Sequence, residues 1–233
     1  MFKRIRSYCL FGIKAVPVSV EVDASQGLPG FTLVGLPDNA VRESRERVVS
    51  AIRCIGKVVT GFRTTVNLSP ADLRKEGSAL DLPLAIGMLV STGELAVPSL
   101  DRYVLVGELS LDGLLKPVRG VLSIAMSLPK DGSVLVIPRA NAQEASLVEG
   151  LNFICADSLK ECVDYLHGQG DVPASNVLIY YMTDGSWFAM RPSGTEPKIK
   201  FYFYTESDSD MDEANHAVDE MTEAVNEIVE GIE

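Results

Sequence analysis

The sequence predicts a mixed α/β fold of the α+β class, in which an α/β sandwich is followed by a small antiparallel sheet with a C-terminal helix. Three observations predict it. Up to about residue 167, β-branched segments alternate with segments whose apolar residues recur at helical spacing. An aromatic-rich hairpin pattern comes next. Finally, residues 1–170 carry 18 basic and 18 acidic side chains, whereas residues 171–233 carry 3 and 14, which indicates two modules.

Alternating and β-branched residues predict the strands of the first module. These strands are expected at about 15–22, 31–34, 64–68, 103–106, 134–137 and 152–155. A first helix is expected after Asp38, which is a favourable N-cap. Further helices are expected at about 81–90, 118–127, 142–149 and 158–166.

The first helix is rich in charge. Arg42 and Glu46, and likewise Glu43 and Arg47, have the i,i+4 spacing of helical ion pairs. This pattern predicts a solvated face. Nucleic-acid binding by Arg42, Arg45 and Arg47 is the alternative, but the glutamates between them cancel much of the positive field.

The composition of the chain argues against several functional classes of protein. Apolar stretches such as 82–90 are far shorter than the ~20 residues that span a bilayer, so we expect a cytoplasmic protein without membrane contact. The acidic C-terminal quarter repels nucleic acid, so no direct nucleic-acid binding is expected. His167 and His216 are the only histidines, which argues against a histidine triad or a histidine-rich metal site, and no cofactor is expected. The cysteines lack metal spacing and are expected to be buried, reduced thiols: Cys9, Cys54, Cys155 and Cys162.

A series of motifs runs through the first module: EVD at 21–23, FTLVGLPD at 31–38, ESRER at 43–47, TVNLSPAD at 65–72, KEG at 75–77, DLPLA at 81–85, VGELSLDG at 106–113 and PVRGVL at 117–122. Residues 1–167 thereby resemble the N-terminal domain of the ComM/YifB family of magnesium-chelatase-like AAA+ proteins. The resemblance implies a fold like that of the Lon protease catalytic domain, a role in competence or DNA processing, and an AAA+ ATPase motor as partner. The 233 residues contain no GxxxxGK[ST] phosphate loop, because the Gly56-Lys57 pair is followed by Val58.

A Lon-like fold raises the question of a Ser/Lys catalytic dyad. The resemblance places Ala79 where Lon-type enzymes have their serine and Leu122 where they have their lysine. The neighbouring Ser78 is expected to cap a helix that starts near Leu80, with Asp81 in its first turn. We therefore expect no catalytic residues in this module and no protease activity.

The second module begins with a predicted hairpin, in which Asp184-Gly185 forms the turn between strands at 176–181 and 187–190. The connection that follows, RPSGTEPKIK at 191–200, contains every basic residue of this acidic module. A guanidinium, hydroxyls, a glycine and ammonium groups are the donors that bind phosphate. The residues expected to bind phosphate are Arg191, Ser193, Gly194, Thr195 and Lys200.

This loop resembles the Arg-x-Ser-Gly-Thr-Glu-Pro loop of the phosphoglucomutase/phosphomannomutase family, whose C-terminal domain holds the substrate phosphate with it. The family's phosphoserine segment, metal loop and sugar loop do not occur in the sequence, so mutase chemistry cannot run on these residues alone. Asp208, Asp210 and Asp212 imitate a metal loop, but Glu213 stands where such loops need Gly or Arg. We expect these acids to flank a helix N-terminus and to bind no metal.

The predicted organisation is a ComM-type Lon-like domain over residues 1–167, a Gly/Pro linker over 168–172 and a phosphohexomutase-like domain over 173–233. Three functions stay open. The chain can be a non-catalytic domain of a ComM-like DNA-processing protein joined to a phosphosugar-binding module, a fragment of a phosphohexomutase, or an artificial fusion with no activity of its own. Expected partners are a sugar phosphate or phosphate, and a second copy of the chain or an AAA+ motor.

Overall fold

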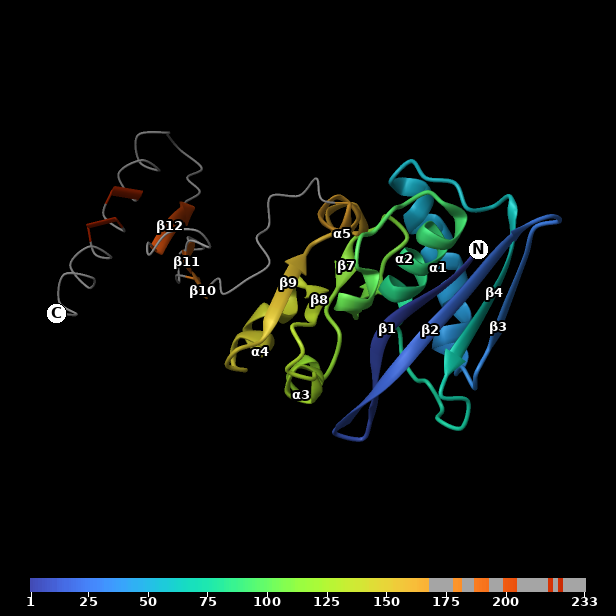
Figure 1. Cartoon of the computed structure of the whole chain (residues 1–233), viewed down its shortest axis with the longest axis horizontal. Coiled ribbons are helices and arrows are strands. Elements are labelled where there is room, and N and C mark those ends of the chain that lie inside the picture. The colour runs from blue at the N-terminus through green and yellow to red at the C-terminus, as the bar shows by residue number, and fades with distance from the viewer. Residues whose placement is uncertain (168–177, 182–186, 193–198, 205–217, 220–221, 224–233) are drawn as a thin grey trace. The chain divides into compact units, whose positions relative to one another are not determined.

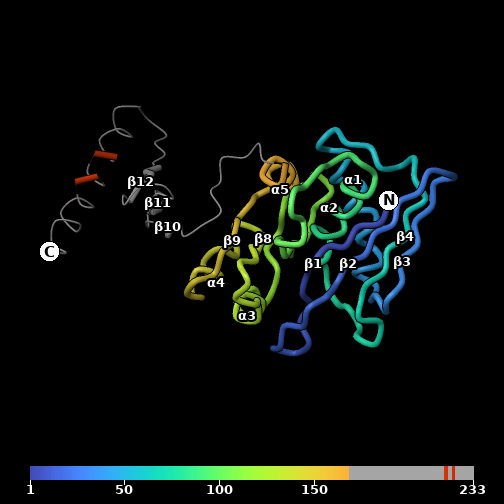
Figure 2. The backbone as a smooth tube through the Cα atoms, viewed as in Figure 1, coloured from blue at the N-terminus to red at the C-terminus, as the bar shows by residue number. Residues whose placement is uncertain are grey.

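The computed structural model describes residues 1–167, 178–181, 187–192, 199–204, 218–219 and 222–223. The chain divides into two compact units, Met1–Ala174 and Ser175–Glu233. The first unit contains a seven-stranded sheet with the order β3-β4-β2-β1-β5-β8-β9 (Figures 1 and 2). Its strands are β1 (Phe2–Phe11), β2 (Lys14–Gln26), β3 (Gly30–Val34), β4 (Phe62–Ser69), β5 (Tyr103–Leu105), β8 (Val134–Pro138) and β9 (Asn152–Ala156).

Helices lie on both faces of the sheet at β8, which is buried throughout, whereas β2, β3 and β4 bury mainly the alternate residues that face α1 and α2. Apolar side chains of α1, α2 and α5 pack in one core with Val134 and Val136 of β8. Those of α3 and α4 pack in a second core with Leu135 and Ile137 of the same strand. The helices are α1 (Asn39–Cys54), α2 (Asp81–Thr92), α3 (Val121–Ser127), α4 (Ala142–Ser146) and α5 (Leu159–Leu166).

The mixed α/β fold class is therefore confirmed, and each predicted strand and helix of the first module exists. The long first strand was not predicted: β1 pairs antiparallel with β2 over its whole length, from Phe2↔Asp23 to Phe11↔Lys14. The short pair β6 (Glu108–Leu109) and β7 (Leu115–Lys116) was not predicted either. The predicted N-cap at Asp38 is confirmed, since its side chain accepts a hydrogen bond from the Val41 N–H, and Ser158 caps α5 in the same way by accepting from the Glu161 N–H.

The sheet consists of two halves that meet between β1 and β5. On one side β1, β2 and β4 are joined by extended antiparallel ladders. On the other side β5, β8 and β9 run parallel. Between the halves, the described register contains the single pair Arg6↔Val104. Side chains add to this junction: the Ser7 hydroxyl donates to the Leu105 carbonyl at 2.7 Å, and Arg6 donates to the Asp101 carbonyl at 2.9 Å.

The second unit contains a three-stranded antiparallel sheet with the order β10-β11-β12. Its strands are β10 (Leu178–Tyr181), β11 (Trp187–Pro192) and β12 (Ile199–Tyr204). Tyr181 pairs with Trp187 at the predicted hairpin. Of the predicted C-terminal helix, the structure describes four residues as helical, Val218–Asp219 and 222–223, and the Thr222 hydroxyl donates to the Val218 carbonyl at 2.7 Å.

Candidate functional site

Polar side chains gather where α1, the start of α2 and β6 meet, next to the position that the Lon-like fold would give to a nucleophile. We call these residues the α1–α2 polar cluster: Asp38, Arg47, Lys75, Ser78, Asp81 and Glu108. Asp38 begins the cluster. Its carboxylate accepts from the Val41 N–H at 2.8 Å and from the Gly77 N–H at 3.1 Å, so the cap of α1 also holds the loop that leads into α2.

The Arg47–Asp81 ion pair is the centre of this cluster. Arg47 Nε donates to Asp81 Oδ2 at 2.7 Å and Nη2 donates to Oδ1 at 3.0 Å, which is bidentate geometry. The Leu109 N–H also donates to Oδ2, at 3.2 Å. The Asp81 side chain is 1% exposed and that of Arg47 22%. Burial raises the pKa of the Asp81 carboxyl, against the lowering effect of Arg47, and the hydrogen bond to Asp81 raises the pKa of Arg47.

The predicted i,i+4 ion pair between Glu43 and Arg47 is therefore wrong. Arg47 turns toward Asp81 on the next helix and not toward Glu43, and Arg45 contacts its neighbour Glu46 at 3.0 Å. A helical wheel shows i,i+4 neighbours and cannot show a carboxylate 34 residues away.

Lys75 is a buried lysine in the loop between β4 and α2. Its ammonium group donates to the carbonyl of Pro70, within the segment that contains the cis Ser69–Pro70 peptide bond. Its backbone pairs with the segment that precedes α1, donating to Leu36 at 3.1 Å and accepting from Asp38 at 3.0 Å. Burial lowers the pKa of the Lys75 amine, although the acidic Asp72 nearby opposes this effect.

Ser78 does not cap α2, which corrects the prediction for this residue. Its hydroxyl donates to the Glu108 carboxylate instead, and Leu80, the residue at the N-cap, makes no side-chain capping hydrogen bond. The segment is held by backbone contacts with Gly107, whose N–H donates to the Ala79 carbonyl and whose carbonyl accepts from the Leu82 N–H, both at 2.9 Å.

The two positions assigned to a Lon-type dyad have apolar side chains in ordered surroundings. Ala79 packs against the core that contains Val118 and Val121. The Leu122 N–H donates to the Glu144 carboxylate at 3.2 Å, which fixes the first turn of α3. Around Ala79, the hydroxyl of Ser78 and the carboxylates of Asp81 and Glu108 bond to other groups of the cluster. The cluster therefore fixes the entry to α2.

The four cysteines differ in exposure, which corrects the expectation that all are buried. Cys9 and Cys162 are buried, Cys155 is half-buried and Cys54 is exposed at the end of α1. Burial raises the pKa of the Cys9 and Cys155 thiols to about 12, so both stay protonated and unreactive at neutral pH. Among the described residues, no group of three or more His, Cys, Asp or Glu side chains could hold a metal ion.

The predicted phosphate loop lies only partly in the described portion of the chain. Arg191 of β11 and Lys200 of β12 pair directly opposite each other in the antiparallel register. The other predicted ligands, Ser193, Gly194 and Thr195, lie outside the described residues, as does the acidic series at 208–212. Within the described segments, no helix is both long and apolar enough to cross a membrane.

Comparison with known protein families decides where the first unit belongs. Residues 20–141, which make up half of the chain, match the family described as subunit ChlI of Mg-chelatase. The chain belongs to this ChlI family. The matched range contains α1, α2 and every residue of the α1–α2 polar cluster. A second family, described as the phosphoglucomutase/phosphomannomutase C-terminal domain, matches residues 151–224.

Individual relatives agree with the ChlI assignment. The chain is 41% identical over 165 residues to the uncharacterized protein YifB of Escherichia coli, covering 71% of this chain and 33% of YifB. It is 41% identical over 175 residues to the competence protein ComM of Haemophilus influenzae, covering 75% of this chain and 34% of ComM. The ChlI-family chain thus spans about a third of the length of these relatives. Lon protease 2 of Bacillus subtilis is 22% identical over 163 residues, covering 63% of this chain and 29% of the protease, consistent with the Lon-like fold.

Proposed function

We propose that residues 1–167 form a non-catalytic domain of a cytoplasmic, ComM-type DNA-processing protein, and that this domain works together with an AAA+ motor. The observation that carries the proposal is the filled position beside α2, where Ala79 packs in an apolar core and the nearby polar groups bond to one another. The similarity to the competence protein ComM supports the assignment to DNA processing. The domain binds its motor partner and contributes no reacting group.

The test is a pair of measurements on the purified full chain. Alone, it is expected to hydrolyse neither ATP nor casein, because the sequence has no phosphate loop and Ala79 cannot act as a nucleophile. Mixed with the part of Haemophilus influenzae ComM that it does not match, it is expected to form a complex on size exclusion with light scattering. ATP turnover that Lys57→Ala abolishes, casein cleavage that Ser78→Ala abolishes, or failure to form the complex would contradict the proposal.

A second function is supported for the other unit by the match to the phosphoglucomutase/phosphomannomutase C-terminal domain. We infer that the loop at 191–200 binds the phosphate group of a sugar phosphate through Arg191, Ser193, Gly194, Thr195 and Lys200. In the described register, Arg191 and Lys200 are paired residues at the two ends of this connection. Two cationic residues at one end of a hairpin suit a dianionic phosphate.

Binding of glucose phosphate is expected to be millimolar. Contacts from a single loop supply only ~4 kcal/mol. A two-dimensional NMR titration of the full chain should shift only the resonances of residues 191–200. Arg191→Ala should abolish these shifts, whereas the charge-matched control Lys130→Ala in the first unit should leave them unchanged. Unperturbed spectra of the parent chain at tens of millimolar ligand would reject the inference.

A further inference from the structure

The edge strand β3 is short, but it carries none of the charges, prolines or bulges by which sheets commonly prevent pairing with other chains. It pairs with β4 in parallel register from Gly30↔Arg63 to Val34↔Asn67, and among the described residues no other strand pairs with it. Its five residues, Gly-Phe-Thr-Leu-Val, contain no charge and no proline. Edge strands are commonly protected by lysine, proline or a bulge. The outer row of backbone groups of β3 is therefore available to a further strand.

Apolar side chains next to β3 are also exposed. Leu28 before the strand is 89% exposed, Val34 at its end is 44% exposed, and Leu36 beyond it is 55% exposed. Single exposed apolar residues are common on soluble proteins, but here three of them lie within nine residues of the chain around one edge strand.

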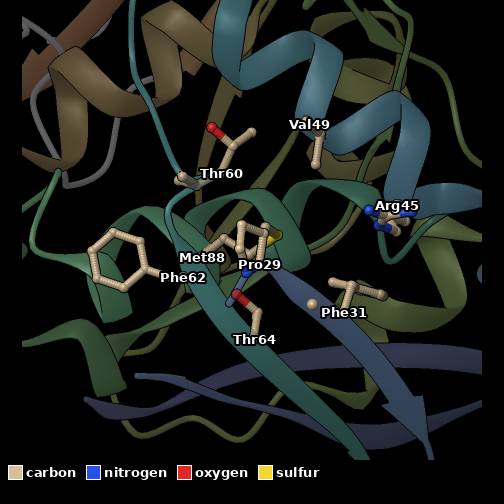
Figure 3. A pocket seen from close by; sticks show the side chains of 10 residues that line it. Pro29, Phe31, Arg45, Val49, Thr60, Phe62, Thr64 and Met88 are labelled. Carbon is tan, nitrogen blue, oxygen red and sulfur yellow. The ribbon is translucent and has the colours of Figure 1, made fainter. Parts of the chain in front are cut away.

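A cleft opens beside β3, between this strand, β4 and α1 (Figure 3). It has a volume of about 100 Å³ and adjoins a second cavity of about 250 Å³ that shares Val49, Val59 and Thr60 with it. We call the two together the β3 cleft. A cavity of roughly 150 Å³ can hold a benzene molecule, so the β3 cleft has room for an aliphatic side chain. Its apolar lining comes mainly from Pro29, Phe31, Val49, Val59, Phe62 and Met88.

Basic side chains line the same cleft. The Arg45 guanidinium carbon lies 5.8 Å from the centroid of the Phe31 ring (Figure 3). Arg45 Nη1 also donates to the Glu46 carboxylate at 3.0 Å, so a carboxylate of a ligand would bind the remaining guanidinium donors. Arg53 is exposed and makes no ion pair within the described residues, whereas Lys57 lies 3.6 Å from the Glu94 carboxylate. The cleft thus combines an apolar lining with three basic side chains, of which Arg45 and Lys57 have acidic partners and Arg53 has no ion pair within the described residues.

We propose that β3 and the β3 cleft bind an extended acidic segment of a partner protein, which joins the sheet as an additional strand. Backbone hydrogen bonds to β3 supply the part of the affinity that does not depend on the sequence of the bound segment. The alternate side chains of the segment supply specificity. An aliphatic side chain on the face toward α1 enters the cleft, and a carboxylate two residues along the same face binds Arg45. A second copy of this chain fits less well, because its β3 strand, Gly-Phe-Thr-Leu-Val, contains no acidic residue.

The test measures binding of a short labelled peptide to the full chain by fluorescence anisotropy. Its sequence, acetyl-Glu-Thr-Val-Thr-Glu-Thr-amide, places Glu and Val on one face of a strand. Binding is expected at low salt and should weaken as salt is added. A peptide with lysine in place of both glutamates should bind at least tenfold more weakly. Two further peptides carry backbone N-methyl groups, one on the odd-numbered residues and one on the even-numbered residues. N-methylation removes backbone donors and leaves the side chains unchanged, so at least one of these peptides should bind tenfold more weakly.

Protein variants locate the site. Arg45→Glu and Arg53→Glu should each lower the affinity for the peptide at least fivefold. Circular dichroism of both variants checks that they remain folded. Lys130→Glu, which makes the same charge change far along the chain, should leave the affinity within twofold. Equal binding of the lysine peptide or of both N-methylated peptides, or no binding at millimolar concentration, would overturn the proposal. If the parent chain forms a dimer and Arg45→Glu abolishes it, the free edge of β3 is assigned to a second copy of the chain instead.

Discussion

Replacing Gly35 by alanine is expected to lower the free energy of unfolding by about 4 kcal/mol. Gly35 has a φ of +99°, a conformation that side-chain-bearing residues rarely adopt. A Cβ atom at this position would lie 2.1 Å from the carbonyl oxygen of Leu68 and 2.9 Å from its backbone nitrogen. These atoms belong to β4 and cannot move aside as a flexible side chain would. The substitution therefore combines backbone strain with a clash inside the sheet.

Gly93→Ala is the matched control. Gly93 has a similar φ of +84° at the C-cap of α2, but a Cβ there would meet no atom within 4 Å. Its substitution should cost only the conformational strain, about 1 kcal/mol. Urea unfolding of the full chain, followed by far-ultraviolet circular dichroism, measures both variants. Equal losses in Gly35→Ala and Gly93→Ala would show that the approach to Leu68 carries no extra cost.

Arg47→Ala is expected to lower the free energy of unfolding by about 3 kcal/mol at neutral pH. The variant leaves the Asp81 carboxylate buried with the Leu109 N–H as its remaining hydrogen-bond partner. Breaking one side of a buried ion pair costs about 3–5 kcal/mol, and the partial exposure of Arg47 favours the lower value. Arg45→Ala on the same helix, whose exposed ion pair with Glu46 contributes little, should cost less than about 1 kcal/mol.

The destabilisation by Arg47→Ala should also depend on pH. Burial already raises the pKa of Asp81, and removal of the arginine raises it further. The folded variant then binds a proton more tightly than the unfolded chain, so its stability increases as the pH falls from 7 toward the ordinary carboxyl pKa of about 4. The double variant Arg47→Met with Asp81→Leu should recover much of the stability at neutral pH. A loss in Arg47→Ala that is constant between pH 7 and pH 4.5 would contradict the assignment to a buried carboxylate.

The elements of the first unit were predictable wherever local patterns carry the information. Asp38 caps α1 as expected because capping depends on residues within one turn. β1 was not predicted, although its residues do alternate: Ile5, Ser7 and Cys9 are buried. The polar Ser7 among these residues and the buried Tyr8 on the opposite face hide this period, and their hydroxyls bond to the Leu105 and Ser127 carbonyls of distant elements. Such pairings depend on strand order, which the local sequence does not reveal.

The sequence predicts which residues occupy the candidate site better than it predicts their partners. The resemblance to Lon-type enzymes assigns Ala79 and Leu122 to the positions of the Ser/Lys dyad. The partners of Ser78 and Asp81 were not predictable in this way, because Glu108 and Arg47 are 30 and 34 residues distant in sequence. One signal was available: Asp81 begins an otherwise apolar helix, and a carboxylate in a buried helix needs a cationic or N–H partner. The phosphate-binding residues Arg191, Ser193, Gly194, Thr195 and Lys200 stay a prediction.

The narrow junction between β1 and β5 has a consequence for how the first unit opens and closes in solution. The ladder of β1, β2 and β4 is held by many backbone hydrogen bonds, whereas the link across to β5 relies on one register pair and the side chains of Ser7 and Arg6. Sub-global unfolding follows such lines of weak backbone pairing. Amide protons of β2 and β4 are therefore expected to exchange with solvent as one cooperative group, and those of β8 and β9 as another, which native-state hydrogen exchange would measure. The central helix α2, packed on β1 and β2, belongs with the first group.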